Sequence, residues 1–280
     1  MKKIRYFLES ILLALVLGLS KILGPIYASN VGGWIGKTIG PRLAASRKAQ
    51  KNLNYIYSDL SDDEIAEITQ NMWENLGRVM MEYPHLKTIT KKYTTVKGVE
   101  NLPQSNKPVI LFAAHLGNWE VMPPSLFYHG KFSPQSVYRA PNNPFSDYLL
   151  KKARQCDPSL QTIPKSKSGM REMIKLLNQG GNLGVLIDQK YNEGIEINFL
   201  GKPAMTSDVF AQLVKKYNCP LIPVRSRRIN GCSFEVEVFK PLDTNNLSVF
   251  EIVEKSHDYL QEWIDEAPSQ WLWLHKRWNV

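Results

Sequence analysis

One short stretch joins an apolar run to residues that could do acid–base chemistry. Residues 108–114 are apolar, and His115, Asn118 and Glu120 follow directly. An apolar run that stops so abruptly predicts a strand buried on both faces, as in a parallel sheet. Ligands of open α/β sheets bind beyond the carboxyl ends of the strands, so we expect His115 in a cleft. There its imidazole could take the proton of an attacking hydroxyl group.

The spacing of His115 and Glu120 decides how the two side chains can meet. On one continuous helix they would point about 140° apart. We therefore expect His115 at the end of a strand, Asn118 as the cap of the next helix and Glu120 in its first turn, where the carboxylate accepts a hydrogen bond from one ring nitrogen. His257 and Glu262 have the same spacing but lie in a helical pattern, so they should point apart. Spacing alone leaves a structural and a catalytic His115 equally open.

Polar side chains that could bind a substrate occur on three further predicted strands. They are Arg139 and Asn142 after the first, Asp188 and Gln189 after the second, and Arg225 in the third. Asn118, besides its expected place as a helix cap, is also predicted to bind substrate. The alternatives are a solvated turn residue for Arg139, a helix cap or salt-bridge partner for Asp188, and a structural role instead of phosphate binding for Arg225. Pro223, in the strand of Arg225, indicates an edge strand or a bulge.

The elements that must hold these residues alternate along most of the chain. Predicted strands cover residues 93–96, 109–114, 136–139, 183–188, 221–227 and 233–239, and predicted helices cover 119–128, 144–156, 168–178, 206–217 and 249–265. Alternation of this kind is typical of an α/β fold with a mainly parallel sheet flanked by helices. A helical segment precedes it, with a capping box at Ser61–Glu64 and an end near Pro84.

Composition narrows the function classes. The 280 residues carry a formal charge of +9, which implies an anionic partner or surface. Much of the excess lies in the first fifty residues beside the most apolar segment, and this favours a membrane over nucleic acid. Three widely spaced cysteines without a CxxC pair indicate neither a disulfide framework nor a zinc site, and no cofactor or metal site is expected. A nucleotide-binding glycine loop is also missing from the sequence.

The apolar segment at residues 6–27 predicts a membrane anchor, and the domains are expected at 1–27 (anchor), 28–92 (helical extension) and 93–280 (α/β domain). Basic residues on both flanks conflict over which side a spanning helix would face. This favours an interfacial or re-entrant anchor, although whether the helix spans or lies on the bilayer stays open. The alternative is a core helix packed on the domain.

Together these residues resemble the late acyltransferases of lipid A biosynthesis, within the glycerolipid acyltransferase superfamily. The likeness covers the N-terminal anchor, His115 to Glu120, residues 137–142, 188–189 and 199–204, and the aromatic and basic ending 270–277. It implies His115 and Glu120 as the catalytic pair, and Arg139 and Asp188 as supports. Some members carry a second acid where Lys190 stands, so the role of that segment is less certain. For the ending, a membrane interface or cleft rim and packing on the sheet both remain possible.

The resemblance also implies substrates and a location. The donor would be a fatty acyl thioester on acyl carrier protein, the acceptor a hydroxyl of a lipid A precursor, and the location the bacterial inner membrane with the catalytic domain facing the cytoplasm. Direct transfer needs a general base and oxyanion donors but no Ser or Cys nucleophile. A lysophosphatidate or other glycerolipid acyltransferase and a non-catalytic binder of lipid or carrier protein are the alternatives.

Overall fold

The centre of the molecule is a twisted seven-stranded sheet. The structure, a computed structural model, describes residues 2–104 and 107–279; Met1, Ser105, Asn106 and Val280, which belong to the expected domains, lie outside the described residues. The strands are β1 (Thr94–Lys97), β2 (Val109–Ala113), β3 (Pro134–Tyr138), β4 (Thr162–Pro164), β5 (Asn182–Leu186), β8 (Leu221–Asn230) and β9 (Ser233–Val238). Their order in the sheet is β1-β9-β8-β2-β5-β3-β4.

Only the β8–β9 pair is antiparallel among the neighbours of this sheet, as far as the described residues extend. This confirms the expected mixed, mainly parallel α/β sheet. β2 is central and all five of its residues are buried, as its continuous apolar sequence requires. The carboxyl ends of β2, β5 and β3 lie side by side, and the predicted site residues follow them.

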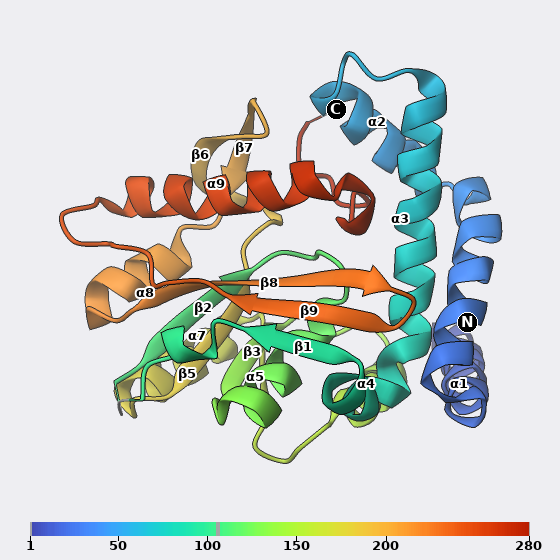
Figure 1. Ribbon diagram of the computed structural model, residues 1–280, viewed down its shortest axis with the longest axis horizontal. Helices are drawn as coiled ribbons and strands as arrows, with labels where there is room; N and C mark the ends of the chain where they lie inside the picture. Colours follow the sequence, from blue (N-terminus) through green and yellow to red (C-terminus); the bar gives the residue numbers. More distant parts are fainter. Residues whose placement is uncertain (1, 105–106, 280) are drawn as a thin grey trace.

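Helices cover both faces of the sheet (Figure 1). On one face α7 (Lys167–Asn178), α8 (Val209–Tyr217) and α9 (Val249–Glu266) pack in one apolar core with Ile110 and Phe112. On the other, α4 (Leu86–Lys92) and α5 (Met122–Gly130) pack with Leu111 and Ala113 in a second core. The alternation of adjacent β2 residues between the two cores follows from the two-residue period of a strand.

The N-terminal third is helical, as predicted. It comprises α1 (Lys2–Ile39), α2 (Ser46–Ile56) and α3 (Asp62–Glu82). Ser61 and Glu64 form the expected capping box at the start of α3. α1 and α3 lie side by side (Figure 1), and their backbones touch at glycines: a Cβ on Gly77 of α3 would lie 2.1 Å from the carbonyl oxygen of Gly32. Larger side chains at this crossing would force the two helices apart.

α1 has two contrasting faces. Its packed face buries small and polar residues, among them Ser20, whose hydroxyl donates to the Met81 carbonyl, and Ser29. Its other face exposes large apolar side chains, namely Ile4, Phe7, Leu8, Ile11, Leu12, Leu15, Leu19, Ile22, Ile26, Tyr27, Trp34, Ile35 and Ile39. Within the described residues one helix, Lys3–Arg42, is long and apolar enough to cross a bilayer, and only 17% of its most apolar window is buried. The helix therefore contacts the domain, as the core-helix alternative expected, and still presents an unpartnered apolar surface.

A kink divides α1. Gly24 has a positive φ of 74° and Pro25 follows it, which breaks the helical hydrogen-bond ladder near the expected end of the anchor. The half before the kink packs against α6 (Pro144–Arg154). There Asn143, the N-cap of α6, donates to the Tyr6 carbonyl at 2.8 Å and to Glu9 at 3.2 Å. On α6 itself Phe145 and Tyr148 are exposed.

Three strands were not predicted. They are β4, β6 (Lys190–Phe199) and β7 (Lys202–Thr206), of which β6 and β7 form a separate antiparallel ribbon. The helix expected from residue 206 accordingly begins later, at Val209. The prediction that Pro223 marks an edge or bulge is wrong, because β8 is an inner strand. Proline is tolerated there because it stands at the end of the ladder with β9, just beyond the Val224–Val238 pair, and its carbonyl still accepts from the Phe239 N–H at 3.0 Å.

The aromatic ending packs inside the protein. Trp271, Trp273 and Trp278 are buried, with the rings of Trp271 and Trp273 4.6 Å apart. Of the two interpretations left open by the sequence, the structure therefore supports packing of the aromatic side chains inside the protein. The segment also returns to the end of β2, where the Leu272 N–H donates to the His115 carbonyl.

Candidate active site

The turn after β2 (His115–Glu120, here called the catalytic turn) is held by hydrogen bonds from several other parts of the chain. The Gly117 N–H donates to the Gln270 carbonyl at 3.0 Å, and the Gly117 carbonyl accepts from Asn75 of α3 at 2.8 Å. Gly117 has a positive φ of 59°, which a β-carbon would strain. Asn118 caps the short 3-10 helix η4 (Trp119–Val121) by accepting from the Glu120 N–H, as predicted.

His115 is held by Asp188. The carboxylate of Asp188 accepts from Nδ1 of His115 at 2.8 Å and from its backbone N–H at 3.0 Å. A third donor, the indole of Trp271, reaches the same carboxylate at 2.8 Å. Asp188 is fully buried. Burial alone would raise the pKa of Asp188, but the charge and hydrogen bonds of His115 hold this pKa well below its usual range.

This contact fixes the chemistry of the ring. With Nδ1–H donating to Asp188, Nε2 is free to accept a proton, which is the arrangement of a general base. Gln189 lies on this side, with its amide nitrogen 3.4 Å from Nε2 of His115 and 3.3 Å from Nε2 of His275. Burial and the charge of His115 lower the pKa of His275 to about 4, so His275 is neutral near pH 7.

The predicted hydrogen bond between Glu120 and His115 is wrong. The Glu120 carboxylate instead accepts from the Tyr83 hydroxyl and from Arg154, both at 2.9 Å. The physical reason is the path of the turn: η4 directs Glu120 toward Tyr83, which follows the last residue of α3, and toward α6. By contrast β5, adjacent to β2 in the sheet, ends beside His115 and delivers Asp188. Glu120 and His115 nevertheless line the same cavity.

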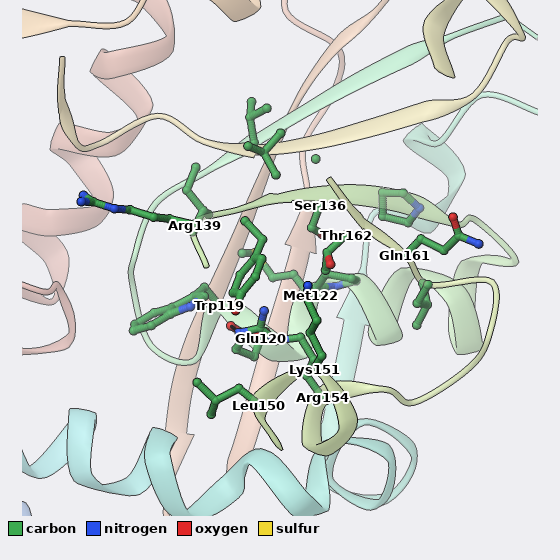
Figure 2. A pocket seen from close by; sticks show the side chains of 18 of the residues that line it. Trp119, Glu120, Met122, Ser136, Arg139, Leu150, Lys151, Arg154, Gln161 and Thr162 are labelled. Atoms are coloured by element: carbon green, nitrogen blue, oxygen red, sulfur yellow. Dashed lines mark hydrogen bonds and ion pairs between the residues drawn. The ribbon is translucent and has the colours of Figure 1, made fainter. Parts of the chain in front are cut away.

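The cavity is large and open, with a volume of about 1050 Å³. It lies on the α5 side of the sheet, where Leu111, Ala113 and Leu186 contribute the strand surface, and α5 and α6 contribute walls. Figure 2 shows Glu120 and Arg154 among the side chains that line it, with Arg139 extending away from them. The guanidinium of Arg154 also stacks over the Tyr138 ring at 4.4 Å.

A glycine and a serine contribute to the strand surface of this cavity. Gly184 of β5 lies in register with Leu111 of β2 and Ser136 of β3, so the three side-chain positions face the same way. A β-carbon on Gly184 would meet nothing closer than 3.7 Å. The glycine is therefore not required by packing or by backbone conformation, and a longer side chain there would enter the cavity.

Of the other predicted substrate-binding residues, Arg139, Asn142 and Gln189 line the cavity. Within the described part of the chain Arg139 has no carboxylate partner, so its charge is free to meet an anion. Asn118, also predicted to bind substrate, is fully buried and does not line the cavity; its side chain bonds within the protein and supports the turn.

The expectation that Arg225 lies in the cleft is wrong. β8 continues to Asn230, so Arg225 lies within the β8–β9 hairpin, where it pairs with Glu237 at 3.0 Å and Glu266 at 2.6 Å. His257 and Glu262 both lie on α9, and His257 is buried whereas Glu262 is exposed, in agreement with the prediction that they point apart. Lys190 bonds to Asn279 near the C-terminus.

Sequence reasoning missed Tyr83, Arg154, Trp271 and His275 as site residues. Trp271 and His275 belong to the aromatic and basic ending, which drew notice but could not be assigned to the cavity. Tyr83 and Arg154 carried no recognisable pattern, since each comes from a helix far from residue 115 in the chain. No group of three or more His, Cys, Asp or Glu side chains within residues 2–104 and 107–279 could hold a metal ion.

Comparisons with known proteins found a matching family model and similar solved structures. The family model described as bacterial lipid A biosynthesis acyltransferase matches residues 1–280. Among solved structures, the chain is similar to the 1-acyl-sn-glycerophosphate (LPA) acyltransferase, PlsC, from Thermotoga maritima, with 16% sequence identity, a TM-score of 0.43, and coverage of 97% of this chain and 100% of that one. No curated protein sequence matches the chain.

Proposed function

Since this chain belongs to the bacterial lipid A biosynthesis acyltransferase family, we propose that it transfers a fatty acyl chain from acyl carrier protein to a hydroxyl group of a lipid A precursor. The observation that carries the proposal is the His115–Asp188 pair on the wall of a cavity of about 1050 Å³. A base with a fixed tautomer beside a large cavity suits direct transfer from a thioester.

The reaction needs one proton acceptor that later becomes a donor. Nε2 of His115 removes the proton of the acceptor hydroxyl as its oxygen bonds to the thioester carbonyl carbon. Asp188, which stays ionised, stabilises the imidazolium that forms. When the tetrahedral intermediate collapses, the carbon–sulfur bond breaks and the leaving thiolate takes the proton from His115. The Gln189 amide lies close enough to this nitrogen to act as a hydrogen-bond donor in the site.

Glu120 has a different place in this proposal. It binds Arg154 and Tyr83, and so joins the catalytic turn to α6 and α3 across the cavity. We assign it to holding the cavity wall and the charge of Arg154 in place. A direct role beside His115 would require movement of Glu120 away from Tyr83, which is buried, and from Arg154, which is largely buried.

The surroundings suit the proposed substrates. Arg139, Lys151 and Lys152 line the cavity and could meet a phosphorylated acceptor or the acidic surface of acyl carrier protein. The exposed apolar face of α1, next to α6, could dock on the inner membrane from the cytoplasmic side. Nucleic acid is not part of the proposal, because the exposed apolar face favours lipid.

The test is the lipid A of cells that lack this protein. We expect mass spectrometry to show lipid A short of one secondary acyl chain. The wild-type gene should restore that chain and a His115→Ala gene should not. Unchanged lipid A would rule out a lipid A precursor as the acceptor. Restoration of the acyl chain by the His115→Ala gene would indicate a non-catalytic binder instead.

A further inference from the structure

Glu82 is a buried charge that the proposed mechanism does not use. It ends α3 and is fully buried, yet its two oxygens accept four hydrogen bonds. Oε1 accepts from Ser29 of α1 at 2.7 Å and from Arg228 of β8 at 2.5 Å. Oε2 accepts from Arg228 at 3.1 Å and from the side chain of Asn118 at 2.8 Å. One carboxylate thus joins α1, α3, β8 and the catalytic turn.

Asn118 is fixed between this carboxylate and the rest of the turn. Its amide nitrogen donates to Glu82, its side-chain oxygen accepts from the Glu120 N–H, and its carbonyl accepts from Ser226 of β8 at 3.0 Å. An asparagine side chain rotated by 180° would place its oxygen against Glu82, so the carboxylate also fixes which way the amide points.

Arg228 extends the same network to Gly117, the residue of the turn that precedes Asn118. Its Nε donates to Asn75 at 2.7 Å, and Asn75 in turn donates to the Gly117 carbonyl at 2.8 Å. The Glu82–Arg228 pair therefore reaches the turn by two routes, through Asn118 and through Asn75. Both routes end two or three residues after His115.

Stability alone gives a weak reason for such a pair. Desolvation of two buried ions offsets most of their attraction, and apolar residues of similar size often serve as well. A fully bonded buried network does, however, select one arrangement of the groups it joins. Building on the proposed function, we propose that Glu82 is a positioning residue for the transfer reaction, because through Asn118 it sets the path of the catalytic turn and thus the placement of His115.

The network includes the apolar helix. Ser29 lies after the kink of α1 and binds the same carboxylate oxygen as Arg228. The segment that carries the exposed apolar face and the turn that carries the base are thus separated by a single side chain. Ser29 remains in a protein that lacks residues 1–27.

The first test is the Glu82→Gln variant with Glu74→Gln as matched control. Glu74 lies on the same helix and pairs with Arg78 and Lys37, but it does not contact the turn. We expect Glu82→Gln to lower kcat roughly 100-fold with KM within about threefold, as for a small misplacement of a base. Glu74→Gln should change neither value more than about threefold. A folded Glu82→Gln protein with kcat near wild type overturns the proposal.

A second pair of variants separates positioning from stability. Glu82→Met combined with Arg228→Met removes both buried charges, so the melting temperature should recover toward that of wild type while kcat stays low. Recovery of kcat together with stability would reduce Glu82 to a structural role. Asn118→Ala leaves the ion pair intact and should lower kcat by a factor comparable to Glu82→Gln; an unchanged kcat there also overturns the proposal.

Hydrogen exchange makes the result independent of the substrate. Amides of residues 115–120 should exchange at least about tenfold faster in Glu82→Gln than in Glu74→Gln, as expected when local opening becomes easier by more than 1.4 kcal/mol. Equal protection in the two variants overturns the proposal. If the wild-type protein transfers no acyl chain to a lipid A precursor, the proposed function fails, while the exchange measurement still decides whether Glu82 holds the turn.

Discussion

Replacement of Asp188 by Asn tests the central contact of the site. All three partners of this carboxylate are donors: Nδ1 and the backbone N–H of His115, and the indole of Trp271. Asn offers one acceptor oxygen and one NH2 group. The oxygen should take the position that serves two donors, the His115 N–H and Trp271, which leaves the NH2 group facing Nδ1.

That arrangement reverses the tautomer of His115. Nδ1 would have to accept from the new amide, so the proton would move to Nε2 and the base would be lost. The variant also loses the negative charge that stabilises the imidazolium. General-base catalysis contributes about 100- to 10,000-fold. We therefore expect kcat to fall in that range, equivalent to about 3 to 5 kcal/mol of transition-state stabilisation.

The assay is steady-state transfer from acyl carrier protein to a lipid A precursor in detergent, at a temperature where circular dichroism shows the variant folded. Asp243→Asn, which changes an exposed loop carboxylate bonded to the Asn245 N–H, is the control. Nitrogen NMR of the His115 ring should show the proton on Nδ1 in wild type and on Nε2 in the variant. A folded Asp188→Asn protein with kcat within fivefold of wild type would refute the assignment of Asp188 as the partner of the base.

Further changes test the rest of the site and the anchor. His115→Ala should abolish transfer, whereas His257→Gln should leave it within a few fold. Burial lowers the pKa of His257 to about 4, so the unfolded chain binds one more proton than the folded protein between about pH 6.5 and 4. As the pH is lowered through this range, the free energy of unfolding should therefore decrease more steeply in wild type than in His257→Gln, as equilibrium denaturation will measure. Glu120→Gln should lower kcat about tenfold, less than Asp188→Asn, because it loosens Arg154 without disturbing the tautomer, and an equal or greater loss would return Glu120 to the side of the base. Gly184→Leu should shift the preference for the acyl donor toward acyl chains about three carbons shorter, since a leucine side chain adds roughly four carbons to the cavity. An unchanged preference for acyl chain length would place the acyl chain elsewhere. Deletion of residues 1–27 should leave a folded protein whose transfer activity is retained on micelles but much lower on bilayers. Equal activity on both would argue against membrane anchoring. Loss of the fold would mean that the main role of this segment is to pack on α3.

Local pattern was sufficient for much of the fold. The apolar run of β2, the capping box of α3 and the alternation of strands and helices after residue 93 each express a preference carried by adjacent residues, and each is confirmed. β6 and β7 were missed because their sequence mixes charged and apolar residues without a clear alternation. Their pairing with each other supplies the order that the pattern lacks.

The same distinction between local pattern and tertiary contact applies to the candidate site. Adjacent residues were enough to predict that His115 follows a central strand, that Asn118 caps the next helix and that His257 and Glu262 point apart, because each depends only on nearby backbone. Which carboxylate meets His115 was decided by the tertiary structure. Register between β2 and β5 brings Asp188 from 73 residues away to Nδ1, while the 3-10 turn directs Glu120, only five residues away, to Arg154. Contacts across a sheet depend on strand order, and spacing along the chain does not encode that order.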